Sequence, residues 1–147
     1  MSCSPRLLKK GVYVADETRV PIDREGDIVA ARQKGRELAQ QIGFSGSELT
    51  VIATAISEIA RNIVVYAQSG EIVLATEKNG GGRPGIVIVA TDIGPGIPNI
   101  EQAMQDGFST GKSLGLGLPG ARRLMDEFEI ESTVGKGTIV TMKKWAR

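Results

Sequence analysis

Apolar residues recur at helical spacing in two segments of the first half of the chain. The first segment runs from Asp27 to Ile42, ends at Gly43, and carries charged residues between its apolar positions. Asp23 precedes this segment and can cap the helix start. We therefore expect an amphipathic helix here, with one face turned toward a core.

A second helical pattern runs from Leu49 to Gln68 and is more apolar than the first. Ser45 and Glu48 stand at its start with the spacing of a capping box. Its core side is expected to carry Leu49, Ile52, Ala53, Ile56, Ile59, Ala60 and Ile63. The pattern predicts a helix that is mostly buried.

β-branched residues dominate the two runs that follow the second helix, Glu71–Thr76 and Gly85–Ala90. A turn rich in glycine, Asn79–Pro84, joins them. Two such runs with a short glycine and proline turn are typical of a hairpin. We expect them to pair as antiparallel strands at the centre of a sheet.

Two further hairpins are predicted near the ends of the chain. The first pairs Val12–Val14 with Arg19–Ile22, because the four residues between these apolar pieces are mostly polar. The second pairs Glu129–Thr133 with Thr138–Met142 across Val134–Gly137. The sheet would therefore gain strands both before the first helix and after the last one.

A third amphipathic helix is predicted before the last hairpin. Its apolar positions are Leu118, Ala121, Leu124, Met125 and Phe128. Pro119 falls in its first turn, where a missing N–H is tolerated. Upstream, a short helix is expected from Asn99 to about Asp106. The segment Gly107–Leu114 has no apolar periodicity, so we expect a mobile loop, which we call the lid.

Composition narrows the class of protein. The chain has 147 residues, enough for one domain with a core, and has no repeat or linker that would divide it. Lysine and arginine number 18 against 17 aspartates and glutamates, so no strong field favours nucleic acid or an anionic membrane. Cys3 is the only cysteine and histidine is absent, which excludes a disulfide framework and histidine chemistry. Without an apolar leader or transmembrane run, we expect a soluble, cytoplasmic protein.

Two glycine-punctuated segments, Asp92–Ile97 and Gly115–Gly120, bracket the lid and indicate backbone folded around phosphates. Two commoner phosphate motifs fit less well. Gly107–Ser113 is one residue short of a P-loop and follows a helix rather than a strand. Gly115–Gly120 matches the dinucleotide pattern GxGxxG, but no strand leads into it. Neither motif alone identifies the site.

Glu58 and Asn62 are spaced i, i+4 on the second helix, so they lie on one face. The same stripe holds Val51, Ala55 and Val65. Burying such polar groups without partners costs several kcal/mol, which leaves two interpretations. Both side chains face water beside Arg61, or both belong to a binding site. Taken alone, the pair favours solvent exposure.

The order of these pieces resembles the GHKL superfamily of ATPases and kinases. The pieces are Glu58-x-x-x-Asn62 on a helix, two strands, Asp92-x-Gly94-x-Gly96, the lid, Gly115-x-Gly117, and Gly137-Thr138 on the last hairpin. The resemblance covers about Glu48 to Met142. It implies a two-layer α/β sandwich of the Bergerat type in one domain, 1–147, with a mixed, mainly antiparallel sheet and helices on one face.

A closer resemblance is to the small serine kinases of the bacterial anti-sigma-factor group, and among them to the stressosome switch kinases. The segments that carry this closer resemblance are Glu58–Asn62, Met104–Thr110, Gly115–Gly120, Leu124–Phe128 and Lys144–Arg147. These five stretches are spread over the nucleotide motifs and the C-terminus. The resemblance therefore implies particular roles for single residues.

On the base side, Asp92 ends an apolar strand and would accept a hydrogen bond from the exocyclic amine of adenine. The alternative is a simple turn aspartate before Gly94. Gly94 and Gly96 would let the chain bend under the base. Thr138 would reach the adenine edge through its hydroxyl, unless it is only a structural strand residue.

On the phosphate side, main-chain N–H groups around the start of the third helix would meet the phosphates: Gly115, Leu116, Gly117 and Leu118. Pro119 removes one such donor, which departs from the wider superfamily. Thr110 and Lys112 would close over the phosphates with the lid, although an exposed lysine is more often only solvated. By resemblance, Asn62 coordinates Mg²⁺ and Glu58 accepts the proton of an attacking hydroxyl.

The resemblance implies a serine/threonine-protein kinase that uses ATP and Mg²⁺. Its acceptors would be STAS-domain proteins of the stressosome, RsbS-like and RsbR-like. The released kinase would activate an RsbU-like phosphatase in general stress and sigma-factor signalling. The alternative is a nucleotide-gated binding protein, either an anti-sigma factor or a phosphatase activator, with phosphotransfer secondary. Trp145 and Met104 are candidate partner contacts if exposed.

Overall fold

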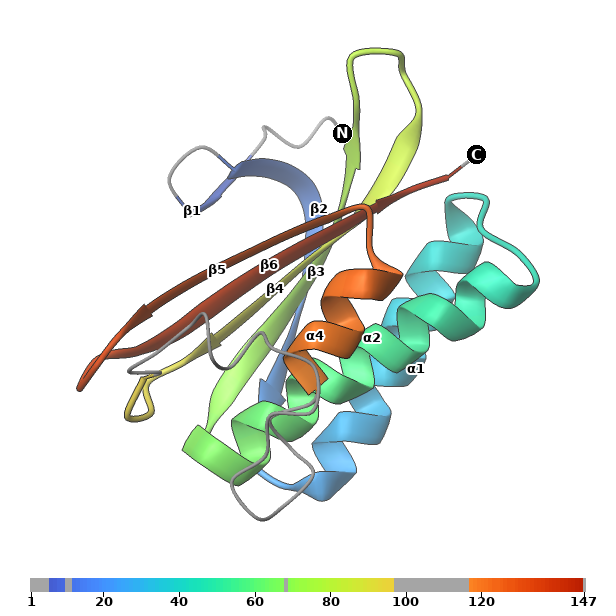
Figure 1. Ribbon diagram of the computed structural model, residues 1–147. Helices are drawn as coiled ribbons and strands as arrows, with labels where there is room; N and C mark the ends of the chain where they lie inside the picture. The colour runs from blue at the N-terminus through green and yellow to red at the C-terminus, as the bar shows by residue number, and fades with distance from the viewer. Residues whose placement is uncertain (1–5, 10–11, 68, 97–116, 147) are drawn as a thin grey trace.

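The computed structural model describes residues 6–9, 12–67, 69–96 and 117–146 (Figure 1). The elements are β1 (Arg6–Lys9), β2 (Val12–Ile22), α1 (Glu25–Gln41), α2 (Ser47–Asn62), the π-helical turn η1 (Ile63–Ala67), β3 (Gly70–Lys78), β4 (Pro84–Asp92), α4 (Gly117–Leu124), β5 (Glu127–Thr133) and β6 (Gly137–Trp145). The expected short helix Asn99–Asp106 and the lid lie outside the described residues.

The six described strands form one sheet in the order β1-β2-β3-β4-β6-β5. Each neighbouring pair among them is antiparallel, so the mixed sheet that the resemblance implied has no parallel pair in this part of the chain. The expected pairing of β3 with β4 is confirmed, with Gly70 opposite Asp92 and Lys78 opposite Pro84. The C-terminal hairpin is also confirmed, and its strands are longer than expected.

Helices α1, α2 and α4 lie on the same side of the sheet, which gives the two layers of the expected sandwich (Figure 1). The core lies between these layers, because the apolar stripe of α2 faces the alternate residues of β3, β4 and β6 that point toward it. All seven residues expected on the core side of the second helix are buried. The predicted α/β fold is thereby confirmed.

Helix α2 continues without a break into η1, so the helical segment ends close to the predicted Gln68. By length and composition alone, Ser47–Ala67 meets the criterion for a helix that crosses a membrane, which we did not expect from the sequence. Half of the apolar window is buried inside the fold. The core helix of a soluble protein passes the same test, and α2 packs against α1, α4 and the sheet, as a core helix does.

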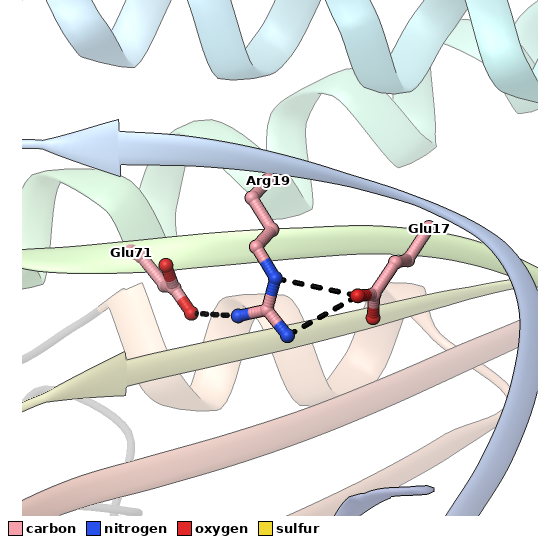
Figure 2. A network of polar contacts seen from close by, with 3 residues as sticks. All are labelled: Glu17, Arg19 and Glu71. Atoms are coloured by element: carbon pink, nitrogen blue, oxygen red, sulfur yellow. Dashed lines mark hydrogen bonds and ion pairs between the residues drawn. The ribbon is translucent and has the colours of Figure 1, made fainter. Parts of the chain in front are cut away.

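The predicted hairpin between Val12 and Ile22 is wrong, because these residues form the single strand β2. The pairing of β2 with β3 shifts register between Ala15 and Thr18, which marks a bulge or irregularity. Figure 2 shows polar contacts at this end of the stretch: Arg19 binds Glu17 on β2 and Glu71 on β3. The hairpin partner of β2 is instead β1.

Both predicted N-terminal caps are also wrong. At α1 the capping carboxylate belongs to Asp27, which accepts the backbone N–H groups of Asp23 at 2.9 Å and Arg24 at 3.2 Å. The Asp23 carboxylate instead accepts the hydroxyl of Ser69. At α2 the cap residue is Gly46, with no side-chain hydrogen bond. The first helix does end as predicted, since Gly43 follows it with a φ of 111°.

The third amphipathic helix is shorter than its apolar pattern predicts. Helix α4 ends at Leu124, Met125 is buried just beyond it, and Phe128 lies in β5. In β5 the side chains alternate between exposed and half-buried, so Phe128 reaches the core as a strand residue. The exposed positions are Glu127, Glu129, Glu131 and Thr133.

Candidate functional site

Three polar side chains form a row across neighbouring strands at one end of the sheet. Asp92 on β4 lies opposite Thr138 on β6, and Thr138 lies opposite Ser132 on β5. Directly opposed residues share a face of an antiparallel sheet, with Cβ atoms about 5 Å apart. Since Ala90 and Val140, the next residues on that face, belong to the core, the row lies on the helix side.

The two oxygens of the Asp92 carboxylate differ in their hydrogen bonding. Oδ1 accepts the backbone N–H of Gly94 at 2.9 Å, which makes Asp92 the turn aspartate that the sequence allowed. Among the described residues no hydrogen bond engages Oδ2. The carboxylate is therefore oriented by the turn and keeps an oxygen for a ligand donor, so the two interpretations of Asp92 are compatible.

Glycines surround Asp92 because backbone segments approach it closely. A β-carbon on Gly94 would lie 2.6 Å from Cβ of Ala67, the last residue of η1. Gly96 has a φ of 78° and lies against Thr133. Gly137 has a φ of 125° and would collide with the Asp92 carbonyl if it carried a side chain. The chain thus folds tightly around this turn, as expected for Gly94 and Gly96.

Thr138 is 8% exposed, and its hydroxyl lies 2.9 Å from the hydroxyl of Ser132. Ser132 also donates to the carbonyl of Gly137 at 3.2 Å. The expectation that Thr138 is a structural strand residue is therefore met in part. Its position opposite Asp92 also places it where a base bound to Asp92 would lie.

Glu58 and Asn62 lie on the last turn and a half of α2, and both are half-buried. Their spacing puts the two Cβ atoms about 5–6 Å apart on one face. Arg61 Nη1 lies 3.5 Å from Glu58 Oε1. The side chains of Glu58 and Arg61 are 35% and 43% exposed, so the ion pair contributes little to stability. A carboxylate and an amide are thus presented together at the edge of the core.

Helix α4 begins at Gly117, one residue after the undescribed segment. The Leu118 side chain is 6% exposed and belongs to the core, so only its main chain is available to a ligand. Pro119 lies in the first turn, as expected, and removes one of the N–H donors that a helix start leaves unpaired. Four residues expected at the phosphates fall outside the described part of the chain: Thr110, Lys112, Gly115 and Leu116.

Two residues of the site were not singled out from the sequence. Tyr66 lies on η1, four residues after Asn62, and is 43% exposed. It directly precedes Ala67, which lies close to Gly94 in the turn after Asp92. Ser132 joins the row through the pairing of β5 with β6. An aromatic residue one turn after Asn62 was a visible signal, whereas Ser132 is only found from strand register.

Comparison with known proteins identifies the architecture. The model of the histidine kinase-like ATPase domain matches residues 21–144. The chain belongs to this family. The GHKL resemblance read from the sequence is therefore confirmed, and it extends from the end of β2 to the end of β6.

Within the histidine kinase-like ATPase family, the chain is similar to the serine/threonine-protein kinase RsbT of Bacillus subtilis (strain 168). The two are 50% identical over 132 residues, which cover 90% of this chain and 98% of the relative. It is also similar to the anti-sigma F factor of Thermoanaerobacter sp. (strain X514), at 36% identity over 118 residues. This match covers 78% of this chain and 82% of the relative.

Solved structures of low sequence identity share the family fold. Full-length ShkA in complex with AMPPNP matches with a TM-score of 0.53 and 19% identity, over 92% of this chain and 33% of that chain. The SiaB–SiaC complex from Pseudomonas aeruginosa matches with a TM-score of 0.53 and 13% identity, over 90% of this chain and 91% of that chain. At such identities the likeness concerns the fold alone.

Proposed function

We propose that the chain is a serine/threonine-protein kinase that transfers the γ-phosphate of ATP to a hydroxyl of a partner protein. The observation that carries this proposal is the 50% identity to a serine/threonine-protein kinase over nearly all of both chains. The spacing of Glu58 and Asn62 on one face of α2, where both are half-buried, supports it. We also propose that the protein works in the cytoplasm as a single domain.

The base of ATP would be bound at the polar row. Asp92 Oδ2 accepts the exocyclic amine of adenine, a donor that guanine does not carry at that position. Thr138 contacts the base edge from the neighbouring strand. Gly94 and Gly96 lack side chains, so the turn leaves room for the base. The exposed ring of Tyr66 is suited to stack on the base.

The phosphates would meet the main chain at the start of α4, where helix N–H groups and the helix dipole favour negative charge. Gly115, Leu116, Gly117 and Leu118, which all precede Pro119, supply these groups, and Thr110 and Lys112 act from the lid. The described residues contain no cluster of three metal-ligating side chains. Mg²⁺, which prefers oxygen ligands shared with phosphates, fits the Asn62 amide oxygen and would neutralise phosphate charge.

Glu58 would act on the acceptor. Its carboxylate is partly exposed one turn before Asn62, so an entering hydroxyl can reach it while the nucleotide occupies the other side. Phosphoryl transfer depends mainly on positioning and electrostatic stabilisation. Glu58 therefore orients the hydroxyl and takes its proton, and no phosphorylated enzyme intermediate is needed.

We propose STAS-domain proteins, RsbS-like and RsbR-like, as acceptors and sequestering partners, and an RsbU-like phosphatase as the target of the released kinase. Labelled ATP, Mg²⁺ and a STAS acceptor test the kinase activity directly. We expect label on the acceptor, and at least about 100-fold slower labelling by Glu58→Gln with nucleotide binding retained. Absence of label with the wild-type chain, or undiminished labelling by the variant, would reject the kinase function.

A second candidate function is favoured by the 36% identity to an anti-sigma F factor. In this case nucleotide binding gates sequestration of a sigma factor or activation of a phosphatase, and phosphotransfer is secondary. Binding assays against a sigma factor, a STAS protein and a phosphatase N-terminal domain separate the two functions. Tight binding of the sigma factor, with slow transfer to every acceptor, would favour the second.

A further inference from the structure

Arg61 has more hydrogen-bonding capacity than its surroundings use. A guanidinium carries five N–H donors, and in the structure one of its nitrogens meets Glu58 Oε1 at 3.5 Å, the outer limit of a hydrogen bond. No other partner of Arg61 is found among the described residues. The side chain is 43% exposed. Arg61 therefore presents unused donors to solvent directly beside the carboxylate proposed to act on the acceptor.

The helical arrangement places Arg61 on the flank of Glu58 that faces away from Asn62. Successive residues of an α-helix are rotated by about 100°, so Asn62 lies about 40° to one side of Glu58 and Arg61 about 60° to the other. If Asn62 faces the nucleotide, Arg61 points about 100° away from it around the helix axis, toward solvent beside Glu58. The same exposed strip continues to Val65, one turn beyond Arg61 and 44% exposed.

We propose that Arg61 is an acceptor-binding residue that selects the partner protein. This inference rests on the proposed kinase function. The guanidinium pairs with an acidic side chain close to the acceptor hydroxyl, while Val65 is covered by an apolar residue of the same segment. Partner binding exchanges the long, solvent-exposed contact with Glu58 for a charge-assisted hydrogen bond, and leaves Glu58 free to engage the hydroxyl.

The test compares Arg61→Gln and Arg61→Lys with Arg36→Gln, an exposed arginine on α1. Arg61→Gln is expected to raise the KM for the STAS acceptor about tenfold or more, because it removes a hydrogen bond to a charged group, and to leave the dissociation constant of ATP within twofold. Arg61→Lys keeps the charge but not the planar fork, so it should restore part of the loss. Arg36→Gln should match the wild type.

A binding measurement keeps this inference separate from the kinase function. Calorimetry of the acceptor against the chain, with a non-hydrolysable ATP analogue present, should show weaker binding by Arg61→Gln even if the wild-type chain transfers no phosphate. An unchanged KM and affinity would overturn the inference and leave Arg61 as a surface ion pair. Faster transfer by Arg61→Gln, or an equal loss of ATP binding, would also overturn it.

Discussion

Glycines at both ends of strand β4 allow neighbouring groups to approach closely, but the two ends differ in what lies in the space. At its start, Gly85 lets the indole of Trp145 lie against the strand, so close that a β-carbon there would collide with it. At its end, Gly94 and Gly137 let backbone segments close around Asp92. The first space is filled by a side chain, and the second keeps a carboxylate oxygen available. Close approach therefore builds a closed corner in one place and, in the other, the turn that we propose binds the base.

Hydrogen bonding follows the same division. At the closed end, the Trp145 N–H binds Asp126 Oδ2 and the indole Nε1 donates to Glu127 Oε2, each at 2.8 Å. The Ala146 N–H donates to the Pro84 carbonyl at 2.8 Å. Trp145, a candidate partner contact in the sequence, is thus engaged within the fold. Side chains at the closed end should contribute to stability and not to nucleotide binding, whereas the Asp92 carboxylate at the open end should contribute to nucleotide binding.

The largest effect is expected from Gly137→Ala at the open end. The new β-carbon would collide with the Asp92 carbonyl, and the φ of 125° is unfavourable for alanine. We expect a loss of about 3 kcal/mol or more in the free energy of unfolding, measured in urea. Gly135→Ala is the matched control, because its φ is 83° but no atom of the described residues lies within 4 Å of the position a β-carbon would take. A control loss as large as that of Gly137→Ala would show that strain alone matters.

Asp92→Asn should weaken ATP binding by about ten- to a hundredfold, because the amide presents only one acceptor oxygen and carries no charge. Stability should change little, since the amide oxygen can still accept the Gly94 N–H. Calorimetry of ATP binding measures the effect. Asp126→Asn, at the closed end, provides the control and should bind ATP like the wild type. Equal affinity for all three chains would contradict the role of Asp92.

Trp145→Ala should have the opposite effect to Asp92→Asn, a loss of stability without a loss of ATP affinity. The indole is half-buried against Gly85, so its removal is expected to cost about 2 kcal/mol of stability. The ATP dissociation constant should stay within twofold, because the change lies at the opposite end of β4. Thermal unfolding and calorimetry on the same sample give both values. A clear loss of ATP affinity would break the division between the two ends.

The smallest effect is expected from Thr138→Val, which keeps the β-branched shape and removes the hydroxyl that faces Ser132. Loss of one buried hydrogen bond should cost about 1 kcal/mol of stability. If Thr138 also touches the base, ATP affinity should fall a few-fold in the same variant. Unchanged affinity would restrict Thr138 to its structural role.

Local patterns predicted the elements whose residues interact mainly with near neighbours. The α2 stripe and the β3–β4 hairpin follow from helical and alternating periodicity, and the structure contains both. The hairpin predicted between Val12 and Ile22 was wrong because Glu17 looked like a turn residue. In the structure Glu17 pairs with Arg19, which also binds Glu71 on the neighbouring strand. Phe128 fits both helical and strand periodicity. It follows Met125 by three residues, as on a helix face, and lies two residues before Ile130 on the same face of β5.

The candidate site was predictable where its residues form a spaced motif, as with Glu58, Asn62 and the turn at Asp92. The position of Ser132 in the polar row depends on strand register, and the approach of Ala67 to that turn depends on the packing of η1, which no local pattern records. Arg61 could be noted beside Glu58 from helix spacing. Its unused donors only became apparent from the surrounding structure.

The exposed glutamates of β5 also affect how copies of this protein behave in concentrated solution. Among the described strands β5 is the last of the sheet, and no described strand pairs with its outer edge, the side on which a strand from another molecule could add. A second β5 pairing there would bring Glu127, Glu129 and Glu131 close to an equivalent set of negative charges. Repulsion between the two sets opposes aggregation by strand addition, while leaving the core-facing residues of β5 free to pack.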